Sequence, residues 1–329
     1  MTDRIITYSD AIREAIGQAM EADPNVFMLG EDIGIYGGAF GVSGDLYHRF
    51  GAERIRDTPI SELGIVGAAV GAALVGMKPI VEIQFSDFTA QAMDQIVNQA
   101  AKIHFMLGGE LSVPMVLRAP LGSGTGAAAQ HSQSLEAWFA HVPGLKVVMP
   151  ATAQDAKGLL LSAIDDPNPV LVLEHKLLYK TSGPVNEEAI RTPIGKSHVA
   201  REGKDLVIVA TGVMVSRSLE AAAALSEKGI DATVIDVRTL SPLDMEPIDE
   251  AVRATGRVLL VQEAPKHVGF MAEVSARLAE GKSLYSLQAP IKRLCGLDIP
   301  IPYAPQLEKS VVPQIPNIIQ AVEDLIREP

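Results

Sequence analysis

Two segments of the chain carry side chains whose type and spacing suit acid–base chemistry. In the first, Glu62 stands just before an apolar stretch rich in glycine and alanine, residues 64–77 (GIVGAAVGAALVGM). Apolar surroundings disfavour the charged form of a carboxylate, which brings its pKa into the range useful for proton transfer. Spacing alone equally fits a glutamate favoured by the dipole in the first turn of a helix, which is the simpler interpretation.

The second segment is a glycine-rich stretch, residues 122–134 (GSGTGAAAQHSQS), with His131 near its end. A loop histidine can donate or accept a proton near neutral pH. The stretch also fits the loose dinucleotide pattern G-x-G-x-x-A, but the strand predicted next, residues 145–149, does not end in the acidic residue that such a site needs. A dinucleotide site is therefore rejected, and a structural or solvated histidine remains the alternative.

Composition and the missing motifs exclude several other functions. Asp and Glu number 40 against 28 Lys and Arg, a formal net charge of −12 with no compensating basic stripe, so a nucleic-acid partner is not expected. The remaining histidines show no metal-binding spacing, and neither a G-x-S-x-G elbow nor a Walker loop occurs. The longest apolar stretch is too short for a membrane span, and Cys295 is the single cysteine, so a cytoplasmic protein without disulfides is expected.

Short buried strands alternating with helices must position these residues. The spacing Thr7–Asp10 predicts a capping box, after which a helix runs until Pro24 stops it. Further helices are predicted over residues 90–107 and 153–165. Apolar runs that predict strands lie between the helices, at residues 26–29, 79–83, 114–118, 145–149 and 170–173. This alternation indicates an α/β fold with a parallel sheet.

A second series of strands and helices follows a polar connection over residues 181–204. Strands are predicted at 206–210, 232–236 and 257–261, and helices at 216–228, 244–255, 270–280 and 315–327. The domain assignment is accordingly residues 1–185, a linker at 186–204, and residues 205–329.

Several stretches together closely resemble the β subunit of the E1 component of thiamine-diphosphate-dependent 2-oxo acid and acetoin dehydrogenases. They span nearly the whole chain in the expected order: LGED (29–32), DTPISELGIVG (57–67), AAQHSQ (128–133), HVPGLKVV (141–148), DAKGLL (155–160) and VRTLSPLD (237–244). The resemblance implies a pyrimidine-binding, parallel-sheet domain followed by a transketolase C-terminal-like α/β domain.

The resemblance also assigns roles to individual residues. Glu62 matches the catalytic glutamate that hydrogen-bonds N1′ of the cofactor's aminopyrimidine, and His131 matches a catalytic histidine that faces the substrate and the lipoyl group. Four other matches concern cofactor binding: Glu31 matches an acid near the cofactor, and Ile60 and Leu63 match apolar residues beside its ring. Phe88 matches an aromatic residue that stacks on the ring, and Gln91 is assigned as a further contact. Some members bind K⁺ through backbone carbonyls, at positions matching Val113, Met115, Val116, Ala163, Asp166 and Asn168.

The family divides its active site between two chains. The GDG motif that holds the diphosphate and Mg²⁺ in thiamine enzymes does not occur in this sequence. The resemblance therefore implies an E1 α subunit that supplies this half in an α₂β₂ heterotetramer. A lipoyl-bearing E2 acyltransferase would be the second partner.

The predicted function is to decarboxylate a 2-oxo acid, or to cleave acetoin, and to reductively acylate the lipoyl group of E2. Residues 127–133 (AAAQHSQ) and 175–179 (HKLLY) lean towards pyruvate or acetoin. An assembly subunit that only docks E2 is the alternative from another class. A self-contained thiamine enzyme would need a further diphosphate domain, for which 329 residues leave no room.

Overall fold

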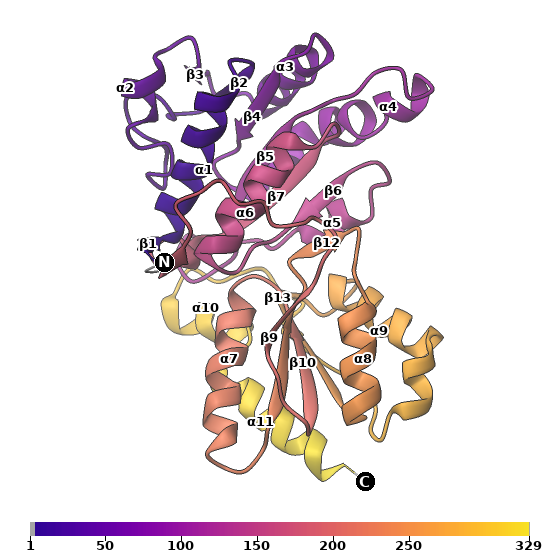
Figure 1. Cartoon of the computed structure of the whole chain (residues 1–329). Coiled ribbons are helices and arrows are strands. Elements are labelled where there is room, and N and C mark those ends of the chain that lie inside the picture. Colours follow the sequence, from indigo (N-terminus) through magenta and orange to yellow (C-terminus); the bar gives the residue numbers. More distant parts are fainter. Residues whose placement is uncertain (1–3, 329) are drawn as a thin grey trace. The chain divides into compact units, whose positions relative to one another are not determined.

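The computed structural model describes residues 4–328, which form two compact units (Figure 1). Unit 1 contains residues 4–121 and 138–194, and unit 2 contains residues 122–137 and 195–328. The second crossing into unit 2, at Ile194/Gly195, lies inside the predicted linker at 186–204. The segment 122–137, which carries His131, belongs to unit 2 although unit 1 residues flank it on both sides. The assignment of domains to 1–185 and 205–329 stays a prediction.

Unit 1 is built on a parallel sheet in which the strands lie in the order β6-β7-β5-β4-β2-β3. Their bounds are β2 Val26–Gly30, β3 Ile55–Asp57, β4 Lys78–Glu82, β5 Val116–Leu121, β6 Lys146–Val148 and β7 Val170–His175. Strands β2, β5 and β7 are buried along their whole length, as expected for a parallel sheet covered on both faces. A separate antiparallel pair joins β1 (Arg4–Thr7) to β8 (Ser182–Val185).

The helices of unit 1 begin largely where the sequence predicts. Helix α1 (Tyr8–Ala22) is capped by Thr7, whose side chain accepts a hydrogen bond from the backbone N of Asp10 at 3.1 Å. Helix α6 (Ala153–Asp165) has the predicted bounds and packs against α1. Helix α3 (Glu62–Leu74) is the glycine- and alanine-rich stretch, and α2 (Leu46–Phe50) is a short helix that the sequence did not predict.

The prediction of one helix over residues 90–107 is wrong. The chain forms a 3₁₀ helix η1 (Ser86–Ala92), a π-helix η2 (Gln95–Ala100) and a short α4 (Ile103–Met106). The Thr89 hydroxyl donates to the Ser86 carbonyl at 2.5 Å, which favours the tighter i→i+3 turn at the start of this region. Apolar periodicity does not distinguish these helix types, and so they read as one helix in the sequence.

Unit 2 contains a sheet with the strand order β14-β13-β10-β11-β9. The strands β10 (Leu206–Ala210), β11 (Ala232–Asp236), β13 (Val258–Pro265) and β14 (Lys292–Gly296) are parallel. Strand β9 (His198–Arg201) pairs antiparallel with β11 at the edge, so the predicted connection 181–204 contains two strands, β8 and β9.

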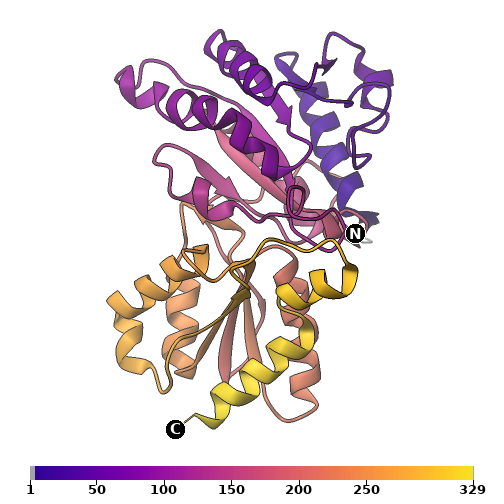
Figure 2. The ribbon, with the colours of Figure 1, turned by 180° about the vertical axis from the view of Figure 1, so that it is seen from behind.

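Helices cover both faces of this sheet, with α7 and α11 on one side and α8 and α9 on the other (Figures 1 and 2). Their bounds are α7 Val213–Ser226, α8 Glu246–Thr255, α9 Phe270–Glu280 and α11 Ile315–Arg327. Shorter elements are β12 (Thr239–Ser241), η4 (Lys282–Ser286) and α10 (Pro305–Val311). The last of these carries Glu308, which matters for the segment that bears His131.

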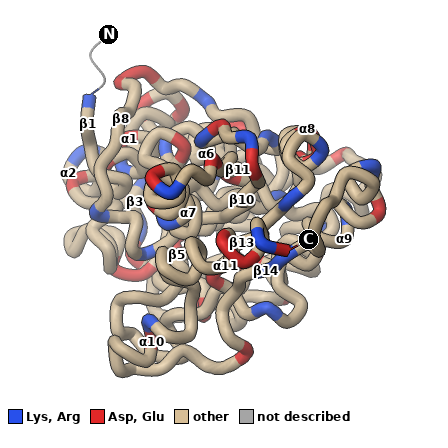
Figure 3. The backbone as a smooth tube through the Cα atoms, turned by 90° about the horizontal axis from the view of Figure 1, so that it is seen from below, with Lys and Arg blue, Asp and Glu red and all other residues tan. Residues whose placement is uncertain are grey.

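Basic and acidic residues are interspersed along the backbone (Figure 3). Within residues 4–328, no helix combines the length and the apolar character needed to cross a membrane. A cytoplasmic location stays a prediction. In the same range, no cluster of three or more His, Cys, Asp or Glu side chains is arranged to hold a metal ion.

Candidate active site

Glu62 and Glu31 lie at the carboxyl edge of the unit 1 sheet. Glu31 directly follows β2, and the chain leaving the neighbouring parallel strand β3 leads through residues 58–61 to Glu62 at the start of α3. A hydrogen bond of 3.0 Å from the Thr58 backbone N to the Gly30 carbonyl joins the two strand ends. Adjacent parallel strands therefore bring both acids to the region where α/β sheets usually bind ligands.

Both carboxyl groups are buried, Glu31 to 7% and Glu62 to 9% exposure. Burial raises the pKa of Glu31, and the negative charges of Glu62 and Asp32 raise it further. The Oε1 atom of Glu31 has no hydrogen-bond partner among the described residues. An unsatisfied buried carboxyl oxygen is costly, and it marks a place where a ligand can supply the missing donor.

Two large apolar residues close to Glu62 in the sequence, Ile60 and Leu63, are unusually exposed. Ile60 is 83% and Leu63 49% exposed, although both are large and apolar. Helix α3 packs against η1, which carries Phe88 and Gln91. Phe88 is partly buried and packs edge to face against Phe85, with the two ring centroids 5.8 Å apart. Gln91 is exposed. An apolar surface beside buried acids suits a ligand with a flat, partly apolar ring.

His131 belongs to unit 2, whereas the six predicted cofactor-binding residues belong to unit 1. The histidine is partly buried, and its backbone N donates to the Ala128 carbonyl at 3.3 Å. Ala128 itself has a positive φ of 61°, which an alanine rarely adopts. The segment around His131 is an irregular loop without helix or strand. Its shape therefore depends on contacts with other parts of the chain.

Three buried glutamates of unit 2 surround this loop, and sequence reasoning missed all of them. Glu263 on β13 accepts a hydrogen bond from the Ser123 backbone N at 2.5 Å, and Glu308 on α10 accepts from Gly124 N at 2.7 Å. Glu136 begins the short helix α5 (Glu136–Ala140), and burial, with a smaller contribution from Glu263, raises its pKa to about 7. No motif connects residues so far apart in the chain, so the sequence held no signal for them.

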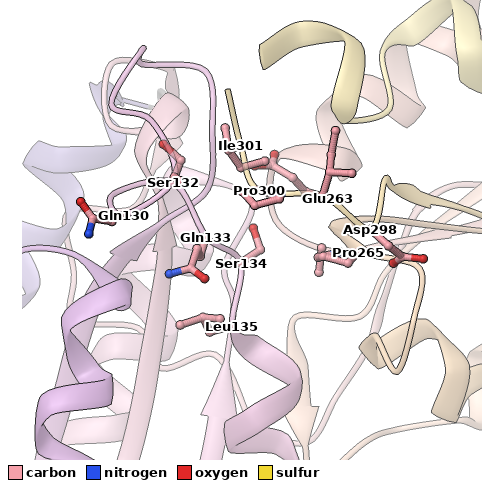
Figure 4. Close-up of a pocket in the computed structure, with 13 residues that line it drawn as sticks. Gln130, Ser132, Gln133, Ser134, Leu135, Glu263, Pro265, Asp298, Pro300 and Ile301 are labelled. Carbon is pink, nitrogen blue, oxygen red and sulfur yellow. The ribbon is translucent and has the colours of Figure 1, made fainter. Parts of the chain in front are cut away.

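A cavity of about 480 Å³ lies beneath the second half of the loop (Figure 4). Residues 129–135, except His131, line one side, and segments 263–265 and 298–301 line the other. Figure 4 shows the loop residues Ser132, Gln133 and Ser134 on the side opposite Glu263, Pro300 and Ile301, with the Ser134 hydroxyl pointing towards Pro300. The hydroxyl oxygens of Ser132 and Ser134 are buried and have no hydrogen-bond partner among the described residues.

The positions predicted to bind K⁺ all belong to unit 1. They cluster in two stretches of sequence, before and at the start of β5 (Val113, Met115 and Val116) and around the end of α6 (Ala163, Asp166 and Asn168). The side-chain oxygen of Asn168 is buried without a hydrogen-bond partner among the described residues. Close by, the Lys146 ammonium lies 2.5 Å from a carboxylate oxygen of Asp166. Whether a cation binds there stays a prediction.

Two family models match the chain, one for each region of the sequence. Residues 4–182 match the transketolase pyrimidine binding domain, and residues 195–318 match the transketolase C-terminal domain. The first match alone covers more than half of the chain. The protein is therefore a transketolase-like protein of the thiamine-diphosphate-dependent class. This confirms the fold class predicted from the sequence.

Curated relatives narrow this class. The chain is 47% identical to the pyruvate dehydrogenase E1 component subunit beta-1 of Arabidopsis thaliana, over 96% of this chain and 88% of that protein. It is 47% identical to the 2-oxoisovalerate dehydrogenase subunit beta of Bacillus subtilis, over 98% of both chains. It is also 46% identical to the acetoin:2,6-dichlorophenolindophenol oxidoreductase subunit beta of Cupriavidus necator, over 96% of both. The chain belongs to the family of E1 β subunits, and the resemblance inferred from the motifs is confirmed.

A solved structure described as a split gene transketolase, an inactive beta4 tetramer, has the same fold. The TM-score is 0.81 over 98% of this chain and 99% of that one, with 24% sequence identity. This likeness concerns the fold alone.

Proposed function

We propose that the chain is the catalytic β half of an E1 enzyme and that it binds the aminopyrimidine ring of thiamine diphosphate beside Glu62. The observation that carries this proposal is the pair of buried acids at one sheet edge, next to the exposed apolar side chains of Ile60 and Leu63. The Oε1 atom of Glu31 has no hydrogen-bond partner among the described residues, and an amino-substituted ring can donate a hydrogen bond to it, which supports the proposal.

The residues present fit that half of the cofactor. Thiamine diphosphate, when bound, supplies the nucleophilic carbon and the electron sink for the decarboxylation. With the cofactor bound, the Glu62 carboxyl would hold a proton at N1′ of the ring, and Ile60, Leu63 and Phe88 would line the ring and exclude water. Glu31, whose pKa burial raises, would lie beside the ring, and Gln91 would provide a further polar contact.

His131 moves a proton at the substrate, either during loss of CO₂ or during acylation of a lipoyl group carried by E2. An imidazole suits both steps because it gains and loses a proton near neutral pH. We propose that the substrate is a 2-oxo acid or acetoin, and residues 127–133 and 175–179 favour pyruvate or acetoin.

The diphosphate and Mg²⁺ are assigned to the E1 α chain, because no GDG motif occurs in this sequence. This division requires an α chain, and we propose the α₂β₂ heterotetramer that the family resemblance implies. We also propose that K⁺ binds the backbone carbonyls of Val113, Met115, Val116, Ala163, Asp166 and Asn168. The buried side-chain oxygen of Asn168, which has no hydrogen-bond partner among the described residues, supports an oxygen-rich site there.

Reconstitution tests the proposal. The chain alone and a cognate α chain alone should show no turnover, and the mixture should turn over pyruvate, 2-oxoisovalerate or acetoin with an artificial electron acceptor. The same assay in potassium and in sodium buffer tests the cation site. Robust activity of this chain alone would refute the divided site, and an assembled but inert complex would favour the assembly-subunit alternative.

A further inference from the structure

The stem of the loop that carries His131 is held by carboxylates. Within residues 122–126, three backbone N–H groups donate to glutamates of the unit 2 body: Ser123 N to Glu263 Oε1 at 2.5 Å, Gly124 N to Glu308 Oε1 at 2.7 Å and Gly126 N to Glu308 Oε2 at 3.1 Å. Glu308 thus bridges two amides with its two oxygens. Hydrogen bonds from N–H groups to ionised acceptors are shorter and roughly twice as strong as neutral ones.

The glycines of the stem make this arrangement possible. Gly122, Gly124 and Gly126 have φ values of 92°, 99° and 68°, a backbone conformation that residues with a side chain rarely adopt. Alternation of such residues with ordinary ones turns neighbouring N–H groups towards one side and forms a concave anion site. Here the protein's own carboxylates occupy that site, so the glycine-rich sequence serves an internal contact.

Both carboxylates are buried, Glu308 to 2% and Glu263 to 6% exposure. Buried charges need partners, and the amides of the stem serve Glu308 in this way. Glu308 lies on α10 and Glu263 on β13. Each is 140 to 184 residues away in sequence from the amide whose hydrogen bond it accepts. Two independent parts of unit 2 therefore fix one short stem.

The rest of the loop is supported differently. Residues 129–135, except His131, border the cavity of about 480 Å³, and the hydroxyls of Ser132 and Ser134 have no hydrogen-bond partner among the described residues (Figure 4). Packing beneath this half is incomplete, so it constrains the backbone less than a filled core would. His131 thus lies within the loosely supported half, and its placement depends on the fixed stem.

We propose that Glu308 and Glu263 are positioning residues that fix the stem and thereby hold His131 in place for proton transfer. The catalytic part of this inference rests on the proposed role of His131. The structural part, that the carboxylates order the stem, stands independently. The two parts are separated by measuring amide exchange and activity in the same variants.

Hydrogen exchange tests the structural part. In the assembled complex, Glu308→Ala should speed exchange of the Gly124 and Gly126 amides at least tenfold. Glu308→Gln keeps one acceptor oxygen but turns an NH₂ group towards the second amide, so it should release one amide and provides a milder variant if the alanine variant folds poorly. Glu263→Gln should act on Ser123. The control is Glu273→Gln, which removes only an exposed pair with Arg277. Unchanged exchange in both Glu308 variants would overturn the proposal.

A double-mutant cycle tests the action through His131. Glu308→Gln should lower kcat about tenfold with little change in KM, yet have almost no further effect in a His131→Ala background, because the residue it positions is gone. Equal losses in both backgrounds would show a general structural role and would overturn the positioning of His131. If His131→Ala leaves activity intact while exchange still responds to Glu308→Gln, the catalytic role proposed for His131 fails and the ordering of the stem stands.

Discussion

The two candidate catalytic residues are positioned in contrasting ways. Glu62 begins a regular helix that follows a strand of a parallel sheet, and the neighbouring strand brings Glu31 to the same edge. His131 lies in an irregular loop whose stem is held by glutamates from distant parts of the chain. Regular elements place the first residue, whereas a few tertiary hydrogen bonds place the second. A site of the second kind is more easily disturbed from a distance.

The largest expected effect concerns the regular site. Glu62→Ala should lower turnover of the reconstituted enzyme by about 10³-fold, within the range known for general acid–base groups. The α chain should still assemble with the variant, because the helix keeps its start and its apolar packing. Assembly by size-exclusion chromatography and single-turnover kinetics would check both statements. Near-normal turnover would mean that Glu62 is only a first-turn helix residue.

The next effect concerns the acid that follows the irregular segment. Burial raises the pKa of Glu136 from its ordinary value of 4.5 to about 7 in the folded protein. Between these pH values the folded state keeps a proton that the unfolded state has lost, so stability falls as the pH rises through this window and then levels off. The contribution is on the order of 3 kcal/mol, at about 1.4 kcal/mol per pKa unit.

Glu136→Gln should remove this dependence, since the amide resembles the protonated acid and does not titrate. Denaturant unfolding at pH 5 and pH 8 would show the variant gaining about 3 kcal/mol relative to the natural protein over that interval. Glu250→Gln, on the exposed surface of α8, is the matched control and should show no gain. A constant difference between variant and natural protein at the two pH values would contradict the buried-acid interpretation.

The smallest effect is expected for His131→Ala. Because the imidazole assists a proton transfer that other groups or water can partly replace, the loss in kcat should be about tenfold to a hundredfold. Comparing the loss for decarboxylation with the loss for lipoyl acylation would show which step the histidine serves. A loss equal to that of Glu62→Ala would remove the contrast between the two sites.

The regular elements were well predicted from the sequence, and the reason is physical. Helices α6, α9 and α11 and strands β10 and β11 have the predicted bounds, because local apolar spacing and capping determine them. Residues 86–106 were predicted less well, since the segments η1, η2 and α4 are too short for apolar spacing to tell 3₁₀, α and π turns apart. Glu31 and Glu62 could be found because they stand at strand and helix ends, although their roles came from the resemblance.

Glu263 and Glu308 could not be found in this way. Their partners are backbone amides, which leave no trace in the sequence beyond the glycines at 122, 124 and 126. Contacts over 140 residues or more depend on the finished fold, and local patterns do not encode them. The same holds for Glu136, whose pKa depends on burial by the whole of its surroundings.

The assignment of residues 122–137 to unit 2 limits how the gene can be dissected. The family models divide the chain near residue 190, between 182 and 195, and a fragment expressed from Gly195 onwards would look like a complete C-terminal domain. Such a fragment would lack the stem, so Glu308 would lose the amides that donate hydrogen bonds to it and one wall of the cavity would be missing. A fragment that reproduces unit 2 must also include the 16 residues 122–137, either fused to it or added as a peptide. The boundary between the two sequence families therefore differs from the boundary between the two structural units.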